Sequence, residues 1–128
     1  MSELVLRKCK KCGAFVKVIE DCTCPGCGIQ CCGEEMEIVK ANSVDAAVEK
    51  HVPVWERVED EVVVKVGEVE HPMTKEHYIM WIAQVSDNRT TTVELYPEQE
   101  TETRFPYIPG SKLYAYCNLH GLWEAEVK

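Results

Sequence analysis

The sequence predicts an all-β protein with two domains: a small metal-bound domain at residues 1–40 and an antiparallel β-sandwich of immunoglobulin-like type at residues 41–128. Seven of the eight cysteines lie between Cys9 and Cys32, and this crowding marks a separate metal-bearing module. After Val52 the chain contains about seven short stretches of strand character, with turn residues between them. Strands of this length and number are typical of a sandwich.

Composition and charge argue against several classes of protein. With 128 residues, 45% of them hydrophobic, the chain can bury a real core. The formal net charge of −8, with no basic stripe, argues against a nucleic-acid partner. No stretch has the apolar length of a membrane span and the first residues lack a targeting pattern, so we expect a cytoplasmic protein without a membrane partner. In a reducing cytosol, cysteines serve more often as metal ligands than in disulfides.

The N-terminal domain is too short to fold by apolar burial alone, so metal binding must supply much of its folding free energy. A short strand at residues 4–7 leads into Cys9 and Cys12, whose spacing is typical of a knuckle around a tetrahedral metal. Further strands are expected at residues 15–20 and 36–39.

Spacing leaves two choices for the four cysteines of this site. Two knuckles, each followed by glycine, favour the set Cys9, Cys12, Cys24 and Cys27. The adjacent pair Cys31 and Cys32 competes with the second knuckle. Consecutive side chains on an extended strand point to opposite faces, so this pair can bind one metal only if the chain bends there.

The sandwich begins after a polar join at residues 41–43, where Ser43 is expected to cap a brief helix at residues 44–49. Apolar and polar residues that largely alternate then predict the strands. These lie at residues 54–58, 62–66, 78–85, 90–96, 101–105, 112–117 and 122–127.

The four histidines and one late cysteine form the candidate site. His51, His71, His77 and His120 fall where predicted strands begin or end, and Cys117 lies three positions before His120. We expect all five to converge at one end of the sandwich. Five such ligands suit an octahedral metal with one vacant position for a small molecule, whereas structural zinc takes four. Imidazole suits iron and a thiolate donates electron density through it, so the set predicts a ferrous site that reduces an oxygen species.

Four separated segments resemble the signature segments of the superoxide reductases. They are residues 49–53, 66–73, 76–79 and 116–121, with the sequences EKHVP, VGEVEHPM, EHYI and YCNLHG. The two-domain layout also resembles desulfoferrodoxin. This resemblance implies an enzyme that reduces superoxide to hydrogen peroxide at a square-pyramidal iron, with the four histidines equatorial and Cys117 axial.

The same resemblance implies a second iron, in a desulforedoxin-like N-terminal domain. Residues 31–36, with the sequence CCGEEM, resemble the closing motif of that iron site. The resemblance therefore favours Cys9, Cys12, Cys31 and Cys32 as its ligands over the two-knuckle set. The extra cysteines, Cys22, Cys24 and Cys27, depart from the simplest family members. The implied partners are superoxide, reduced rubredoxin or a similar electron donor, and a second copy of the chain in a homodimer.

The resemblance also gives roles to Lys50 and Glu49. Superoxide is an anion that approaches a chain of net charge −8, so a local positive field must overcome the general repulsion. Lys50 is implied to supply that field and to help hold water, and Glu49 is implied to close the vacant position once the iron is ferric. Without the resemblance, the two residues indicate only a solvated ion pair. Two alternative functions are a superoxide dismutase, which needs no donor, and a rubredoxin-like electron carrier that uses only the N-terminal cysteines.

Overall fold

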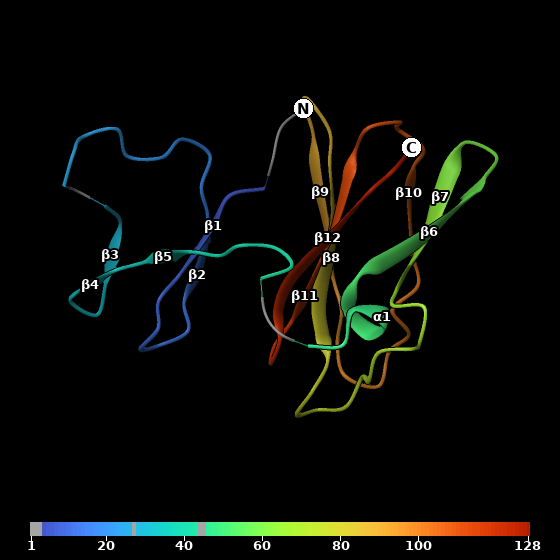
Figure 1. Cartoon of the computed structure of the whole chain (residues 1–128), viewed down its shortest axis with the longest axis horizontal. Helices are drawn as coiled ribbons and strands as arrows, with labels where there is room; N and C mark the ends of the chain where they lie inside the picture. The colour runs from blue at the N-terminus through green and yellow to red at the C-terminus, as the bar shows by residue number, and fades with distance from the viewer. Residues whose placement is uncertain (1–3, 27, 44–45) are drawn as a thin grey trace. The chain divides into compact units, whose positions relative to one another are not determined.

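The computed structural model describes residues 4–26, 28–43 and 46–128, and of Glu49 it describes only the backbone. The chain divides into two compact units, residues 4–40 and 41–128, which are described separately (Figure 1). Every strand pairing in both units is antiparallel among the described residues, so the predicted all-β fold is confirmed. Within the described residues, no helix is long and apolar enough to cross a membrane.

Three short strands form the sheet of the N-terminal unit, in the order β2-β1-β5. The central strand β1 (Leu6–Lys8) pairs with β2 (Phe15–Lys17) on one side and with β5 (Glu37–Ile38) on the other. A separate hairpin is formed by β3 (Gln30–Cys31) and β4 (Glu34–Glu35). These strands are too short to bury much apolar surface, as the sequence predicts.

Arg7 ties the cysteine-rich loop to this sheet. Its guanidinium donates through Nη1 to the carbonyl of Met36 at 2.9 Å, and through Nη2 to both carboxylate oxygens of Asp21 at 2.9 and 3.1 Å. The hydrogen bond from Arg7 is the largest cause that lowers the pKa of Asp21, followed by the bond from the Cys22 N–H. In a unit with little apolar core, this charged pair fixes where the loop begins.

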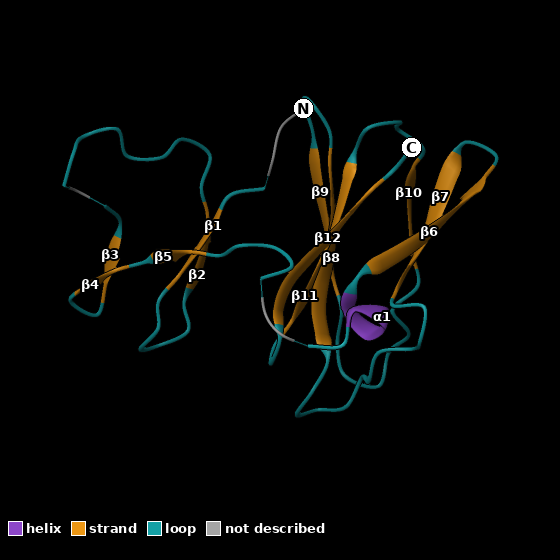
Figure 2. Ribbon diagram, viewed as in Figure 1, coloured by secondary structure: helices purple, strands orange, loops and turns teal. Residues whose placement is uncertain are grey.

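Two sheets form the C-terminal unit (Figure 2). The first has the order β10-β7-β6, made of β6 (Pro53–Val58), β7 (Glu61–Val66) and β10 (Thr103–Pro106). The second has the order β12-β11-β8-β9, made of β8 (Ile79–Val85), β9 (Thr90–Glu94), β11 (Lys112–Cys117) and β12 (Gly121–Glu126). All seven strands predicted for this unit are present, each close to its expected bounds.

The helix differs from its prediction. A single turn, α1 (Val48–His51), stands where a helix at residues 44–49 capped by Ser43 was expected. Residues 44 and 45 lie outside the described residues, and the helix cap is Ala47, whose extended backbone (φ −65°, ψ 108°) prevents the helix from starting earlier. Val52 is also extended, as the residue before a proline should be, and ends the turn directly after His51.

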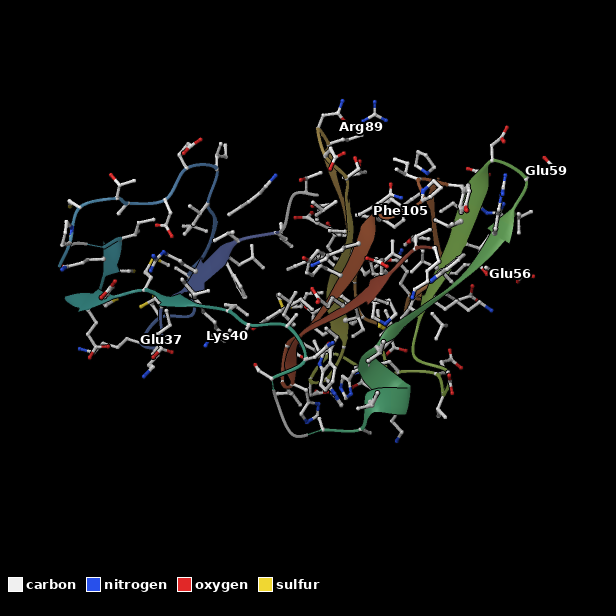
Figure 3. All side chains as sticks on the ribbon, turned by 45° about the horizontal axis from the view of Figure 1, so that its top comes forward. Glu37, Lys40, Glu56, Glu59, Arg89 and Phe105 are labelled. Atoms are coloured by element: carbon white, nitrogen blue, oxygen red, sulfur yellow. The ribbon has the colours of Figure 1, made fainter. Side chains whose placement is uncertain are left out.

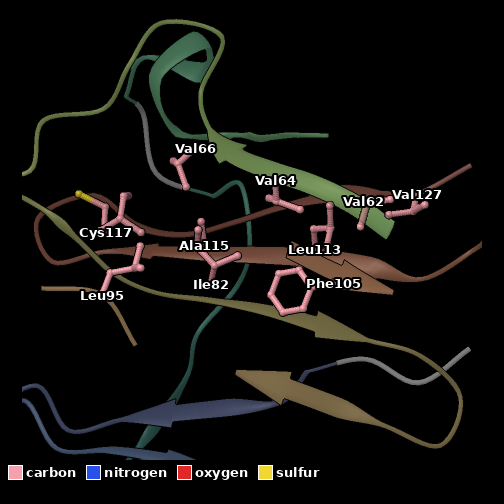
Figure 4. Close-up of a cluster of buried hydrophobic side chains, with 11 residues drawn as sticks. Val62, Val64, Val66, Ile82, Leu95, Phe105, Leu113, Ala115, Cys117 and Val127 are labelled. Atoms are coloured by element: carbon pink, nitrogen blue, oxygen red, sulfur yellow. The ribbon is translucent and has the colours of Figure 1, made fainter. Parts of the chain in front are cut away.

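The core lies between the two sheets and leads to the histidines. Alternate residues of β7 (Val62, Val64 and Val66) face alternate residues of β11 (Leu113, Ala115 and Cys117), and all six are at most 1% exposed (Figure 4). Figure 3 shows Phe105 within the sandwich, whereas Glu56 and Glu59 project from the β6–β7 hairpin. Cys117 is therefore the last member of a buried row, which fixes its side chain before any metal binds.

Candidate metal centres

The structure brings all five predicted residues of the C-terminal site together. His51 ends α1, His71 and His77 lie on the loop between β7 and β8, Cys117 ends β11, and His120 lies in the turn before β12. The ligand atoms of His51, His71, His77 and Cys117 all lie within 4.8 Å of one another. The Nδ1 of His120 is 3.1 Å from the Nε2 of His51 and 3.8 Å from the Sγ of Cys117.

The four imidazoles form a closed square. Each ring meets the next edge to face, with centroid distances of 4.7 Å (His51 to His71), 4.7 Å (His71 to His77), 5.0 Å (His77 to His120) and 4.8 Å (His120 to His51). The diagonal from His51 to His77 is longer, at 6.5 Å. Since the Cys117 thiol is close to all four rings, five donors surround one point and a sixth direction is left without a donor from this set.

Hydrogen bonds orient two of these rings. The Nδ1 atoms of His51 and His71 lie 2.7 Å from the carbonyl oxygens of Ala47 and Pro72, so in each ring Nδ1 carries the proton and donates it, and Nε2 carries the lone pair that a metal needs. Such bonds fix the tautomer and direction of metal-binding histidines.

Two buried nitrogens test whether a metal fits. The Nε2 atoms of His71 and His77 are buried and have no hydrogen-bond partner among the described residues. A buried, unpartnered nitrogen is costly, and a metal ion at the centre of the square would satisfy both. Burial is the largest cause that lowers the pKa of His71 to about 4 and also lowers the pKa of His77, which keeps both rings in the neutral, metal-binding form.

Cys117 needs a cation to become a ligand. Burial raises the pKa of its thiol, and the N–H groups of Leu119 and His120 only partly oppose that effect. A metal ion deprotonates a coordinating thiol outright, so the buried thiol and the neutral imidazoles form a coherent donor set only around a cation.

The four-cysteine group of the N-terminal unit consists of Cys9, Cys12, Cys31 and Cys32. Their Sγ atoms all lie within 4.8 Å of one another, with 3.6 Å between Cys12 and Cys31 and 3.9 Å between Cys31 and Cys32. Hydrogen bonds from N–H groups, that of Cys12 first, lower the pKa of the Cys9 thiol and so favour its thiolate. Four sulfur donors at these distances suit a tetrahedral metal.

A tight turn explains how adjacent cysteines join this group. Cys32 (φ 53°) and Gly33 (φ 77°) form the left-handed turn between β3 and β4, and this is the bend that the sequence requires if both cysteines share a metal. In the competing set, Cys24 is not a member of the group, and Cys27 lies outside the described residues.

Comparison with known proteins identifies the family. The desulfoferrodoxin family model matches residues 43–126. The chain belongs to the desulfoferrodoxin family. The desulfoferrodoxin of Syntrophotalea carbinolica is 44% identical over 126 residues, which cover 97% of each chain. The superoxide reductase of Pyrococcus horikoshii is 41% identical over 100 residues, which cover 62% of this chain and 87% of that protein.

A solved structure agrees with this assignment. The crystal structure of the superoxide reductase from Treponema pallidum has a TM-score of 0.74 and 34% sequence identity, and the match covers 98% of this chain and 100% of that one. The chain therefore carries the donor sets for two iron centres, one of four histidines and a cysteine and one of four cysteines.

Lys50 lies beside the histidine square. It is an exposed residue of α1, next to His51, and its charge contributes to the lowered pKa of His77, after burial and the charges of His120 and His51. The Glu49 side chain lies outside the described residues.

The backbone of Lys50 packs directly on Gly67. Gly67 has a φ of +83°, and a Cβ atom there would lie 2.5 Å from the carbonyl oxygen of Val69 and 2.7 Å from the carbonyl carbon and oxygen of Lys50. Only glycine allows this approach, which places α1 against the loop that leads to His71.

Sequence reasoning missed Trp123. Its indole ring stacks on the His51 imidazole, with centroids 5.0 Å apart, and its Nε1 donates to the His120 carbonyl at 3.0 Å. One residue therefore contacts two members of the square. The alternation of β12 places Trp123 on an apolar face, which indicates only a core residue.

Proposed function

We propose that this protein is a superoxide reductase: superoxide takes up one electron and two protons and leaves as hydrogen peroxide, and an external donor restores the electron. The observation that carries the proposal is the square of four imidazoles with one thiol close to all four. Ferrous iron held by His51, His71, His77, His120 and Cys117 would supply the single electron at the position that these donors leave open. The superoxide reductases among the chain's relatives and structural neighbours support the same function.

The residues around the metal centre would attract superoxide and assist its reduction. Neutral His71 and His77 add no positive charge of their own, and Lys50 is a cation whose charge reaches His77. The Lys50 ammonium draws superoxide toward a chain whose net charge of −8 would otherwise repel it. We assign to Lys50 the further task of holding the water that delivers protons, and to Glu49 that of covering the open position after turnover.

The finer assignments rest on the resemblance of the sequence to the family. We propose residues 41–128 as the catalytic domain and residues 1–40 as a desulforedoxin-like domain whose iron is held by Cys9, Cys12, Cys31 and Cys32. Reduced rubredoxin or a similar small protein is the proposed donor, and the chain is proposed to act as a homodimer. We place the reaction in the cytoplasm, where a reducing environment keeps cysteines available as metal ligands.

Stoichiometry tests the proposed reaction. The iron-loaded full chain is mixed with superoxide and an excess of reduced donor, and the oxidised donor, peroxide and oxygen are measured. A reductase consumes one electron from the donor and forms one peroxide for each superoxide, without releasing oxygen. A dismutase would release oxygen and leave the donor unoxidised, and an electron carrier would leave superoxide to its spontaneous decay; either result would overturn the proposal.

A further inference from the structure

The junction between Cys117 and the His77 loop is held by the side chain of Asn118. Its Oδ1 accepts the N–H of Tyr78 at 3.0 Å, and its Nδ2 donates to the carbonyl of Glu76 at 2.9 Å. Its own main-chain N–H donates to the Tyr78 carbonyl at 3.2 Å. Three hydrogen bonds therefore connect the residue after Cys117 to the two residues that flank His77.

These bonds take the place of regular backbone pairing between β11 and β8, where that pairing becomes irregular. Along β11, Tyr116 pairs with Trp81 but Cys117 pairs with Ile79, so the register shifts by one residue at the cysteine. A bulge of this kind redirects a side chain and interrupts regular pairing. After the register shift, the side-chain amide of Asn118 links β11 to the chain before β8. It accepts one hydrogen bond and donates another, as the backbone of a paired strand residue would.

The arrangement differs from that of an ordinary turn asparagine. An asparagine that only shapes a turn bonds main-chain groups a few residues away. The Asn118 side chain instead bonds groups 40 and 42 residues earlier in the chain. The bonds between Thr74 and His77 are local: the Thr74 N–H donates to the His77 carbonyl at 3.0 Å, and the His77 N–H donates to the Thr74 Oγ1 at 3.2 Å. They shape the loop, but they do not tie it to β11.

We propose that Asn118 is a positioning residue of the iron site, which sets the separation between the Cys117 Sγ and the His77 Nε2. A metal requires its donors within a few tenths of an ångström of their places, and groups that orient ligands typically change metal affinity by about 10- to 100-fold. The inference rests on the proposed function, because it takes both residues as ligands of one iron.

The test compares the iron-loaded full chain with its Asn118→Ala variant. The control is Gln99→Ala, since the Gln99 Oε1 accepts the N–H of Tyr96 at the same 3.0 Å, in an exposed turn. We expect Asn118→Ala to release iron from the histidine site to a chelator about tenfold faster than the wild type, and to shift the thiolate-to-iron absorption band. Gln99→Ala should change neither.

Asn118→Asp separates the two side-chain bonds. It keeps an oxygen for the Tyr78 N–H but turns a second oxygen toward the Glu76 carbonyl in place of the Nδ2 donor. In the iron-free full chain, hydrogen exchange at the Tyr78 amide should be about tenfold faster than in the wild type for Asn118→Ala, and close to the wild type for Asn118→Asp. Both variants should release iron faster than the wild type.

Equal iron release and an unshifted band in Asn118→Ala and Gln99→Ala would overturn the inference while leaving the proposed function in place. A wild-type chain that binds no iron at the histidine site would instead overturn the proposed function, and this inference with it.

Discussion

The indole ring of Trp123 lies stacked on the imidazole of His51, with centroids 5.0 Å apart and an interplanar angle of 23°. The same indole donates its only hydrogen bond to the His120 carbonyl, so the buried tryptophan connects two neighbouring corners of the histidine square.

Trp123→Phe should keep the stack and lose the bond to His120. We expect the unfolding free energy to fall by about 1 kcal/mol for the lost hydrogen bond, and iron to bind about tenfold more weakly. Thermal unfolding and chelator competition measure the two effects. Trp81→Phe is the matched control, since Trp81 stacks on Tyr116 and not on a histidine. Equal iron affinities in both variants would contradict a role of Trp123 at the site.

Cys117→Ser should reduce superoxide turnover to background even in molecules that retain iron, because a hydroxyl cannot donate electron density as a thiolate does. The sulfur-to-iron charge-transfer band of the oxidised centre should disappear as well. Cys22→Ser is the control, since Cys22 is an exposed free thiol outside both metal groups. A Cys117→Ser protein with the wild-type band and rate would show that Cys117 is not a ligand.

Lys50→Ala should slow the capture of superoxide by about tenfold, since a cation beside the open position concentrates the anion there. Lys50→Arg should recover part of the rate. Added salt should slow the wild type, because screening weakens the local attraction, and the slope should flatten or reverse in Lys50→Ala. Pulse radiolysis across a salt series gives both rates, and identical slopes would argue against guidance by Lys50.

Replacing both Cys31 and Cys32 with serine should remove iron from the N-terminal unit and leave the histidine site loaded. Replacing Cys24 and Cys27 should leave both irons in place, since the turn at Cys32 already brings the adjacent pair to Cys9 and Cys12. Metal analysis with visible spectroscopy distinguishes the two outcomes. Iron lost only from the Cys24 and Cys27 variant would support the two-knuckle set.

Asp21→Asn should destabilise the N-terminal unit at neutral pH. Because Arg7 lowers the pKa of Asp21, the ion pair stabilises the fold above the ordinary aspartate pKa of 3.8, and this stabilisation is lost as the pH falls through the lowered value. The difference between wild type and variant should therefore shrink as the pH drops below 3.8. Hydrogen exchange of the β1 amides measures it, and a difference independent of pH would contradict the ion pair.

The strands and the ligand types could be predicted because they depend on local pattern. Alternation along the C-terminal segment gave all seven strands, and the scarcity of histidines made each one a candidate. The helix was misplaced because the backbone of Ala47 is extended, although alanine is the residue that most favours a helix.

Spacing could not choose between the cysteine sets, since the deciding feature is the left-handed conformation of Cys32. Residue spacing also could not identify the contact of Trp123 with the site or the long-range hydrogen bonds of Asn118. The partners of both lie in other segments: Trp123 stacks on the residue that ends α1, and Asn118 bonds the loop before β8. The contacts of both residues depend on which segments become neighbours in the fold, and the local sequence pattern does not predict this.

The contact of Gly67 with the Lys50 backbone limits how this protein can vary. Where a single added carbon would lie 2.5 Å from one carbonyl oxygen and 2.7 Å from another, no compensating change in a side chain can make room, because both obstacles are main chain. Gly33 is under a weaker constraint: its φ of +77° favours glycine, but no atom lies within 4 Å of a Cβ there, so asparagine is an acceptable substitute. Position 67 therefore has to stay glycine for as long as the backbone of residue 50 lies against it, whatever side chain residue 50 carries.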